Sequence, residues 1–301
     1  MLQGRLLATL GGLAAVLLWS LTVAFTRSLT EKLGPLTAAA TVYGIGGLLA
    51  IANLAVREER RKRVYQLPRA YLVGCGLLFV VCMISLNLGI GLSGNREQVL
   101  QVGLLNYLWP VLTLLLTVVL LGKSASMILL PGTLLALGGV FLVLTDGAQI
   151  SWGAICINLS DNPLVYVLGL VAAASWALYS VLTRKWVVGR NVGGPMIFLP
   201  VAALVLLVLR CFVDEPCHWS SRACMEALIL GVAAFAAYVM WDKAMREGNV
   251  VIVVVGSYMT PFLSTIVSCL YLSVRPGLTL WVGCGMLVAG SLLSWYSLRE
   301  E

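Results

Sequence analysis

The stretch QVLQVGLLNYLWPVLTLLLTVVLLG, residues Gln98–Gly122, contains no charged side chain over 25 positions. A helix that crosses the roughly 30 Å hydrocarbon core of a bilayer needs about 20 predominantly apolar residues. The stretch is therefore long enough to cross a membrane once. Asn106, Tyr107 and Trp109 lie near its middle, directly before Pro110.

The composition of the whole chain agrees with a membrane protein. Hydrophobic residues make up 60% of the 301 positions and charged residues 11%, against roughly 45–50% and 25% in globular proteins. Too few polar side chains remain to cover a soluble protein of this size. The composition excludes a disordered chain and a large soluble domain.

Nine further charge-free segments accompany Gln98–Gly122. The ten predicted spans are Leu6–Thr26, Pro35–Val56, Ala70–Asn95, Gln98–Gly122, Ser124–Thr145, Asn162–Thr183, Asn191–Leu209, Ala227–Trp241, Gly248–Val274 and Pro276–Leu298. Because backbone groups inside a bilayer must be satisfied within each segment, we predict an all-α integral membrane protein of ten transmembrane helices. The eighth span has only 15 residues between Glu226 and Asp242, so we expect one of these carboxylates near the headgroups. The uncharged stretch Gly147–Ser160 has 14 residues and is predicted to be a loop or interfacial segment, with Trp152 at headgroup depth.

Lysine and arginine are distributed unequally between the two sides of the predicted membrane. With the N-terminus in the cytoplasm, the inner segments hold 14 of the 20 basic residues and the outer segments hold 6. An excess of Lys and Arg on the cytoplasmic side is the positive-inside rule, so both termini are predicted to be cytoplasmic. The net charge of +7 then follows from topology and does not indicate nucleic-acid binding.

The second half of the chain repeats features of the first. Trp19 lies seven residues before Thr26 and Arg27, and Trp176 lies seven before Thr183 and Arg184. Two more matches recur at an offset of 151, namely Tyr107 and Pro110 with Tyr258 and Pro261, and Gly132 and Gly139 with Gly283 and Gly290. The chain is therefore predicted to contain two copies of a five-helix unit.

An odd number of helices per copy requires the two copies to insert in opposite orientations. Inverted repeats are typical of secondary transporters, whose substrate site lies near the bilayer midplane between the halves. We predict that residues 1–146 form the first repeat, 147–161 a periplasmic connection, and 162–301 the second repeat.

Each predicted repeat opens with a tryptophan-containing helix that ends in a Thr-Arg pair, which resembles the drug/metabolite transporter superfamily of the EamA type. Within that superfamily, LNYLWP at Leu105–Pro110 and GSYMTP at Gly256–Pro261 are similar to bacterial aromatic amino acid exporters. The resemblance implies a basket-shaped inner-membrane carrier of ten helices that moves amino acids out of the cell by alternating access. Aromatic amino acids are the implied substrates, and two alternatives stay open: a strict preference for them, or a broad range that includes large aliphatic amino acids. Beyond the amino acid and the lipid bilayer, nothing indicates a cofactor, a nucleic acid or an obligatory protein partner.

Polar and aromatic side chains near the middle of the spans are the candidate substrate contacts. Flat rings stack on an aromatic ligand, and an indole N–H or a phenol O–H directs a polar contact. The predicted contacts are Trp19, Asn106, Tyr107, Trp109, Trp176, Tyr179 and Tyr258. Pro110 and Pro261 are predicted hinges, because proline removes a backbone donor and frees a carbonyl one turn back. The alternative for the aromatic residues is anchoring at the membrane interface.

Two other features have more than one interpretation. The i,i+4 spacing of Asp242 and Arg246 favours a surface ion pair, and the alternative is a gate or proton site at the cytoplasmic mouth. Cys217 and Cys224 lie in a connection predicted to face the oxidising periplasm, where a disulfide between them is allowed.

Residues for enzyme chemistry are scarce. His218 is the single histidine, and we find no paired acids with metal-ligand spacing, no nucleophile motif and no glycine-rich phosphate loop. We predict no catalytic residue and no metal site. The alternatives are a polytopic membrane enzyme acting on lipids, which would carry Asp or His clusters at a membrane face, and a transporter of another small metabolite or drug. A passive channel fits less well with aromatic candidates at the midplane.

Overall fold

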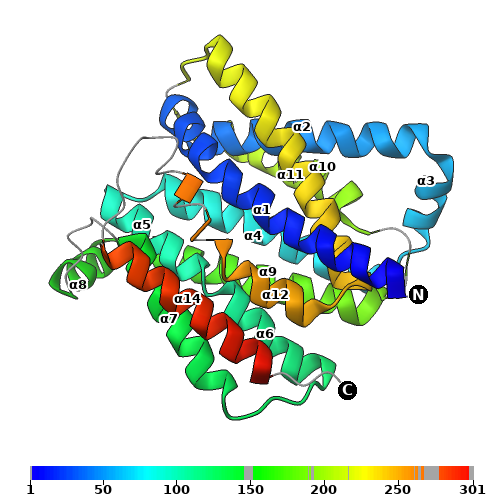
Figure 1. Cartoon of the computed structure of the whole chain (residues 1–301). Coiled ribbons are helices and arrows are strands. Elements are labelled where there is room, and N and C mark those ends of the chain that lie inside the picture. Colours follow the sequence, from blue (N-terminus) through cyan, green and yellow to red (C-terminus); the bar gives the residue numbers. More distant parts are fainter. Residues whose placement is uncertain are drawn as a thin grey trace.

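The computed structural model (Figure 1) describes residues 2–145, 152–188, 190, 193–215, 217–260, 262–263, 266–267 and 278–297. Each element of regular secondary structure in these ranges is a helix, which confirms the predicted all-α class. In chain order the elements are α1 (Leu2–Leu33), α2 (Pro35–Val56), α3 (Glu58–Tyr65), the π-helix η1 (Tyr71–Cys75), α4 (Gly76–Gly91), α5 (Arg96–Asn106), α6 (Trp109–Leu121), α7 (Leu129–Thr145), α8 (Trp152–Asp161), α9 (Pro163–Val187), α10 (Pro195–Arg210), α11 (Ser221–Glu247), α12 (Val250–Ser257) and α14 (Leu278–Ser297).

The protein is a membrane protein with several helices that are long and apolar enough to cross a bilayer. Among the described residues there are six such stretches: Leu2–Ser20, Pro35–Val56, Tyr71–Gly91, Gln101–Leu121, Pro163–Val187 and Ser221–Glu247. Two more apolar helices, Leu129–Leu142 and Pro195–Arg210, are shorter.

The eighth predicted span differs from its prediction. The helix α11 extends well beyond the uncharged stretch at both ends, to Ser221 and Glu247. Glu226 and Asp242 are therefore inside the helix, and both are buried against other groups of the protein. Partners explain the burial: Glu226 accepts from Arg222 and Ser28, and Asp242 accepts from Arg246.

The fourth predicted span is interrupted at its middle. Helix α5 ends at Asn106 and α6 begins at Trp109. Pro110 lacks the N–H that would bond the carbonyl of Asn106 four residues earlier. At the break, the N–H of Leu108 bonds the carbonyl of Leu105, three residues back, at 3.1 Å. The interruption places the non-helical residues Tyr107 and Leu108 inside the helix bundle.

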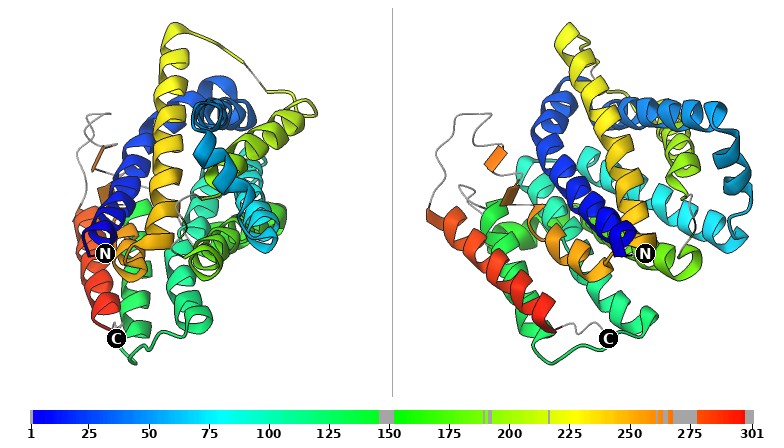
Figure 2. Two further views of the ribbon diagram at one scale, coloured as in Figure 1. Left: turned by 90° about the vertical axis from the view of Figure 1, so that its right-hand side faces the viewer. Right: turned by 45° about the vertical axis from the view of Figure 1, so that its right-hand side comes forward.

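The largest helix contacts join distant parts of the chain. Helix α1 packs on α11, α2 on α10, α4 on α9, and α7 on α14. Smaller contacts join α6 to α9 and α1 to α12. Figure 2 shows α1 and α11 side by side and the pair formed by α7 and α14 beside the other helices.

Glycines allow the closest of these contacts. A Cβ on Gly139 of α7 would lie 2.6 Å from the carbonyl oxygen of Gly283 on α14, and a Cβ on Gly290 would lie 2.4 Å from the backbone nitrogen of Ala136. Small residues let transmembrane helices approach backbone to backbone. The glycines that recur at an offset of 151 therefore lie at the α7–α14 interface.

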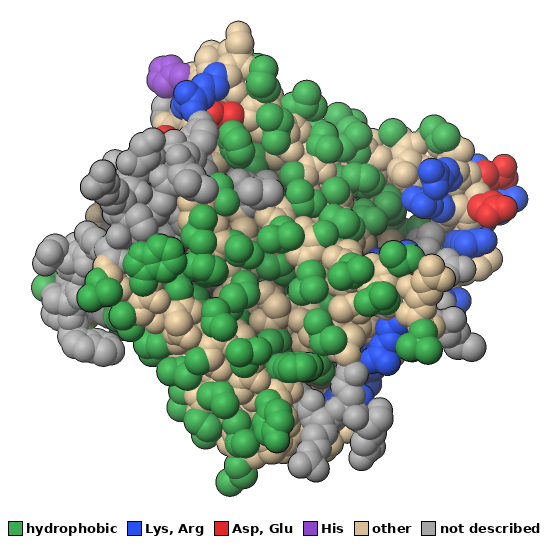
Figure 3. Space-filling model, viewed as in Figure 1, with side chains coloured by type: hydrophobic (Ala, Val, Ile, Leu, Met, Phe, Trp, Pro, Cys, Tyr) green, Lys and Arg blue, Asp and Glu red, His purple; other side chains and the backbone are tan. Residues whose placement is uncertain are grey.

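The surface separates into apolar and charged regions. Hydrophobic side chains predominate over the middle of the face shown in Figure 3, and charged side chains gather over α3, with smaller groups beside the histidine and at the lower edge. Helix α3 holds exposed ion pairs, Lys62 with Glu58 at 3.0 Å and Arg63 with Glu59 at 3.3 Å. His218, the single histidine, lies at the opposite end of this face. The stretch predicted as a loop or interfacial segment contains the short helix α8, and the side chain of Trp152 is outside the described set.

Candidate functional site

A cavity of about 230 Å³ lies in the middle of the helix bundle. Sites for drug-sized ligands usually measure about 300–1,000 Å³, so this cavity suits a small metabolite. Its lining consists of Trp19, Cys82, Met83, Leu86, Asn106, Tyr107, Trp109, Trp176, Tyr238 and Thr260. The lining residues come from α1, α4, α5, the α5–α6 break, α6, α9 and α11, and from Thr260 after α12.

Tryptophan rings form one wall of the cavity. The Trp19 ring meets the Trp176 ring edge to face, with centroids 5.5 Å apart and planes at 78°. The Trp109 ring is nearly perpendicular to that of Trp176, at 6.3 Å. Trp241, behind these rings, lies 5.3 Å from both Trp19 and Trp109. Edge-to-face pairs hold rings in defined orientations, so the indole faces left open toward the cavity are fixed in direction.

Polar groups enter the cavity at the break between α5 and α6. Asn106 and Tyr107 line the cavity there, one turn before Pro110. Thr260 lines it from beyond the end of α12, and its hydroxyl donates to the carbonyl of Ser257 at 2.7 Å. Broken helices in a bilayer are tolerated where they line a cavity. The cavity thus has hydrogen-bonding atoms beside its aromatic wall.

The structure brings five of the seven predicted contact residues around this one cavity. Those five are Trp19, Asn106, Tyr107, Trp109 and Trp176. Tyr179 and Tyr258 are buried and are not part of the lining. Pro110 lies at the start of α6 beside the lining, and Pro261, the second predicted hinge, lies outside the described residues.

Tyr179 is not part of the cavity lining, although it lies one turn from Trp176 on α9. Trp176 and Tyr179 are three residues apart, and their rings pack at 5.1 Å. The Tyr179 hydroxyl donates to Asp242 Oδ1 at 3.3 Å. The tyrosine therefore lies behind Trp176, between the cavity wall and a carboxylate.

Five lining residues were missed by sequence analysis. Tyr238 had a usable signal, because Tyr238 and Trp241 are three residues apart on one face of α11 and both contact the Trp19 ring. The lining residues Cys82, Met83 and Leu86 carried no such signal. Apolar side chains in a span look alike whether they face lipid, a neighbouring helix or a cavity.

The predicted ion pair between Asp242 and Arg246 forms, but the prediction that it lies on the surface is wrong. The pair forms at i,i+4, with Arg246 Nε donating to Asp242 Oδ2 at 2.7 Å, but both residues are buried. Asp242 also accepts a hydrogen bond from the Tyr71 hydroxyl at 2.8 Å. The aspartate thus interacts with η1 and α9 as well as with its own helix.

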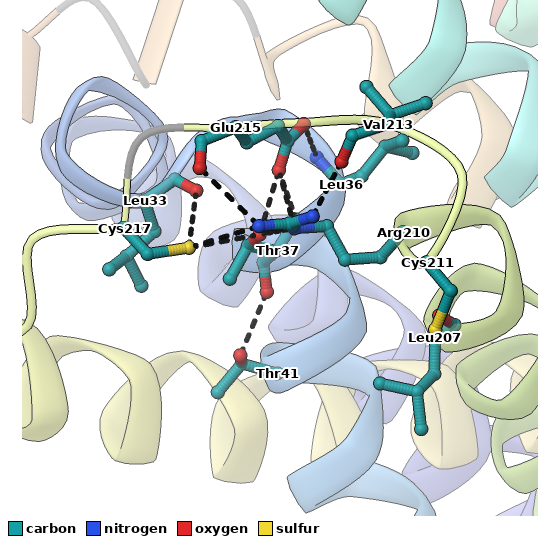
Figure 4. A network of polar contacts seen from close by, with 10 residues as sticks. All are labelled: Leu33, Leu36, Thr37, Thr41, Leu207, Arg210, Cys211, Val213, Glu215 and Cys217. Carbon is teal, nitrogen blue, oxygen red and sulfur yellow. Dashed lines mark hydrogen bonds and ion pairs between the residues drawn. The ribbon is translucent and has the colours of Figure 1, made fainter.

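Cys217 and Cys224 are free thiols in the structure, so the permitted disulfide is not formed. Cys217 instead belongs to a polar network where the start of α2 meets the end of α10 (Figure 4). Arg210 Nη2 donates to Cys217 Sγ at 3.4 Å. Glu215 accepts the backbone N–H groups of Leu36 and Thr37, each at 2.8 Å, at the N-terminus of α2, where a carboxylate is favoured.

The lining of the cavity contains no charged side chain, and no group of three or more His, Cys, Asp or Glu side chains that could hold a metal occurs among the residues described here. An aromatic wall with a few amide and hydroxyl groups holds a ligand by stacking, apolar burial and directed hydrogen bonds. The arrangement is suited to binding.

Comparison with known proteins agrees with this geometry. A family model described as the EamA-like transporter family matches the chain over residues 6–145 and 163–296. The chain is 37% identical over 296 residues to the aromatic amino acid exporter YddG of Escherichia coli (strain K12), a match that covers 97% of this chain and 98% of that relative. It is 36% identical over 295 residues to the protein of the same name from Salmonella typhimurium, covering 98% of each. A crystal structure with 25% sequence identity has a TM-score of 0.80 and covers 99% of this chain and 100% of that chain.

Proposed function

We propose, from the premise that the chain belongs to the EamA-like transporter family, that it exports amino acids, aromatic ones among them, from the bacterial cell. Its relatives are named as exporters, so the protein is a transporter and not an enzyme. Transport follows alternating access, in which the central cavity is open to one side of the membrane at a time.

The observation that carries this proposal is the composition of the cavity. Rings of Trp19, Trp109 and Trp176 meet around a space bordered by Asn106 and Tyr107. An aromatic amino acid would stack its ring on the indole wall. Amide and hydroxyl groups at the α5–α6 break would hydrogen-bond its ammonium and carboxylate groups.

We further propose that ten helices form two inverted repeats, with residues 1–146 and 162–301 as the copies and 147–161 between them. The two family matches, 6–145 and 163–296, fall within these limits. The pattern of helix contacts also supports the division. Each span in one half has a counterpart five spans away in the other half. When every span is replaced by its counterpart, the α1–α11 contact corresponds to the α9–α4 contact, and the α1–α12 contact to the α9–α6 contact. The α2–α10 and α7–α14 contacts correspond to themselves.

The proposed location is the inner membrane, with both termini in the cytoplasm. Cysteines introduced one at a time into the segment Arg57–Arg69, in a chain without its native cysteines, should be shielded from impermeant thiol reagents in intact cells and react after the cells are opened. A cysteine introduced at His218 is the matched control and should react from outside. Labelling of cysteines in Arg57–Arg69 in intact cells would show that the orientation is the reverse of the proposed one.

Uptake of labelled amino acids into proteoliposomes tests the function. We expect transport of tryptophan, phenylalanine and tyrosine above that of protein-free liposomes, and we expect phenylalanine to compete with tryptophan. Repeating the assay with a pH gradient separates proton-coupled transport from facilitated diffusion. A protein that moves none of the amino acids would contradict the proposal. Transport of a different metabolite or drug, or a lipid product, would support one of the alternatives.

A further inference from the structure

A buried ion pair lies between the cavity and one end of the bundle. Asp242 follows the cavity-lining Tyr238 by about one turn of α11, and Arg246 follows Asp242 by another. The two charged residues are 1% and 4% exposed. At this end, the N–H of Asn249 donates to Thr9 Oγ1 of α1 at 2.9 Å, so the pair is near the end of the bundle that carries the N-terminus. Buried charges within transmembrane helices are costly and usually serve function.

Groups from other elements hold the pair in place. The hydroxyls of Tyr71 in η1 and Tyr179 in α9 donate to Asp242 Oδ1, at 2.8 and 3.3 Å. Arg246 donates to the carbonyl of Arg190, between α9 and α10, and to Glu247 Oε1 at 3.0 Å. The pair therefore ties η1, α9 and the segment after α9 to α11.

The backbone near Gly193 leaves no free space against the carboxylate. A Cβ on Gly193 would lie 1.6 Å from Asp242 Oδ2. The N–H of Gly194 donates to the Tyr71 hydroxyl at 2.8 Å, and that hydroxyl donates to Asp242. A ligand can therefore reach Asp242 only if these groups move away.

Aromatic rings fill the space between the pair and the cavity. The ring of Tyr179 packs on the cavity-lining Trp176 at 5.1 Å and on Phe79 at 5.5 Å, while its hydroxyl bonds Asp242. Tyr179 thus contacts both the cavity wall and the ion pair. Movement of this side chain would expose one to the other.

The distribution of charge distinguishes the cavity from the Asp242–Arg246 pair. The lining of the cavity has no charged side chain, whereas Asp242 and Arg246 present an anion and a cation side by side. Access of a ligand from this end would break the hydrogen bonds from Tyr71 and Tyr179 to Asp242 and the bond from Arg246 to the Arg190 carbonyl. Asp242 and Arg246 then have hydrogen-bonding positions to fill, and unfilled positions on buried charges are costly.

We propose that the Asp242–Arg246 pair is a second recognition site, used in the inward-open state, for the ammonium and carboxylate groups of the amino acid. The ammonium takes the place of the two tyrosine hydroxyls on Asp242, and the carboxylate takes the place of the Arg190 carbonyl on Arg246. Because the ligand contacts the pair only in the open state, its binding shifts the protein toward that state. This inference rests on the proposed export of amino acids from the cytoplasm.

The test compares the two faces of the membrane. Tryptophan uptake is measured in inside-out vesicles, which present the cytoplasmic face, and in right-side-out vesicles. Loss of a hydrogen bond to a charged group corresponds to about a 10- to 150-fold change in affinity. We expect Asp242→Asn to raise KM by that factor at the cytoplasmic face and to change KM less than about threefold at the outer face. Lys243→Gln, at the exposed next residue, is the matched control and should leave both values unchanged.

Tyr179→Phe gives a result of the opposite sign. It removes a donor that competes with the substrate ammonium for Asp242, so we expect a lower KM at the cytoplasmic face. A purely structural role for the network predicts an equal or higher KM. Tryptamine and indole-3-propionate each lack one charge of tryptophan. With wild-type protein, their inhibition relative to tryptophan should be at least tenfold weaker at the cytoplasmic face than at the outer face, since the central cavity alone would weaken it equally at both faces.

The outcomes separate this inference from the proposed function. If vesicles with wild-type protein take up no amino acid at all, the export proposal itself is contradicted. Wild-type transport with an unchanged KM in Asp242→Asn, or an equal rise at both faces, overturns the second recognition site alone. If Asp242→Asn is absent from the membrane, the Tyr179→Phe measurement and the analogue inhibition decide the question. An unchanged KM in Tyr179→Phe, with analogue inhibition weakened equally at both faces, overturns the second recognition site.

Discussion

The indole rings of Trp19 and Trp176 meet edge to face at 5.5 Å, although 157 positions separate them in the chain. Each residue lies seven positions before a Thr-Arg pair in its own half. Positions that match in the sequence thus come together in space at the cavity. The cavity at this contact is lined by residues from both halves of the chain, which agrees with the proposed alternating access between two halves.

Removing one ring should reduce transport of aromatic substrates selectively. Stacking contributes about 0.5–1.5 kcal/mol per ring pair beyond area burial, or about a 2- to 13-fold change in affinity. We expect Trp109→Ala and Trp176→Ala to lower tryptophan and phenylalanine transport by at least this factor and threonine transport by less, in uptake assays at equal protein amounts. Trp281→Ala removes an indole that is half exposed on α14 and should change neither. Equal losses for all substrates would indicate a packing or gating role.

Filling the backbone break should impair transport. In Pro110→Ala the new N–H can bond the carbonyl of Asn106, so α5 and α6 can join into one continuous helix. We expect at least a roughly tenfold loss of transport rate with normal membrane insertion, because the polar backbone at the cavity is withdrawn. Pro131 lies in the first turn of α7, where no helical hydrogen bond is missing. Pro131→Ala should therefore transport normally, and normal transport by Pro110→Ala would show that the break is dispensable.

The α7–α14 contact should tolerate no added methyl group at its centre. A Cβ on Gly290 would lie 2.4 Å from the backbone nitrogen of Ala136, whereas a Cβ on Gly285, on the same helix, meets nothing within 4 Å. We expect Gly290→Ala to destabilise the protein by about 1–3 kcal/mol, the usual cost of overpacking, and to lower the thermal midpoint in detergent. Gly285→Ala should leave the midpoint unchanged or slightly raised, since alanine favours helix more than glycine. Equal midpoints for the two variants would contradict the close approach.

The thiol of Cys217 should be unusually reactive near neutral pH. Hydrogen bonds lower the pKa of this thiol, the one from Arg210 most strongly and the one from Thr37 next. The thiolate is the reactive form of a cysteine. The stabilised thiolate persists to lower pH than an ordinary thiolate does, so reactivity falls only as the pH drops below the lowered pKa. In a chain that keeps Cys217 as its single cysteine, Arg210→Gln should raise the pKa and slow maleimide labelling at pH 7 by roughly threefold or more. Arg210→Lys keeps the positive charge and should lose less. A midpoint of the pH–rate curve that does not move in Arg210→Gln would contradict the role of the guanidinium.

Hydropathy and covalent structure account for what the sequence could predict at the site. The break at Pro110 follows from a missing N–H, which is a property of one residue. Trp19 and Trp176 hold matching positions in the two halves of the sequence, which predicts that both face one cavity; their ring contact is a finding of the structure. By contrast, Tyr179 and Tyr258 carry the same ring as Tyr238, yet only Tyr238 lines the cavity. Which side of its helix a tyrosine occupies is readable from spacing, but what lies against that side is not.

The sequence alone therefore determined the membrane class, the helical fold and the position of the backbone break, because each depends on residues within about 20 positions. It also predicts the internal repeat, by direct comparison of the two halves. Tertiary structure decided the lining of the cavity and the burial of Asp242 with Arg246. An i,i+4 ion pair has the same local geometry on a wet surface and in a helix bundle. Its surroundings are supplied by Tyr71 and Tyr179, which are 171 and 63 positions away from Asp242, and only the packing of η1 and α9 against α11 removes the pair from water.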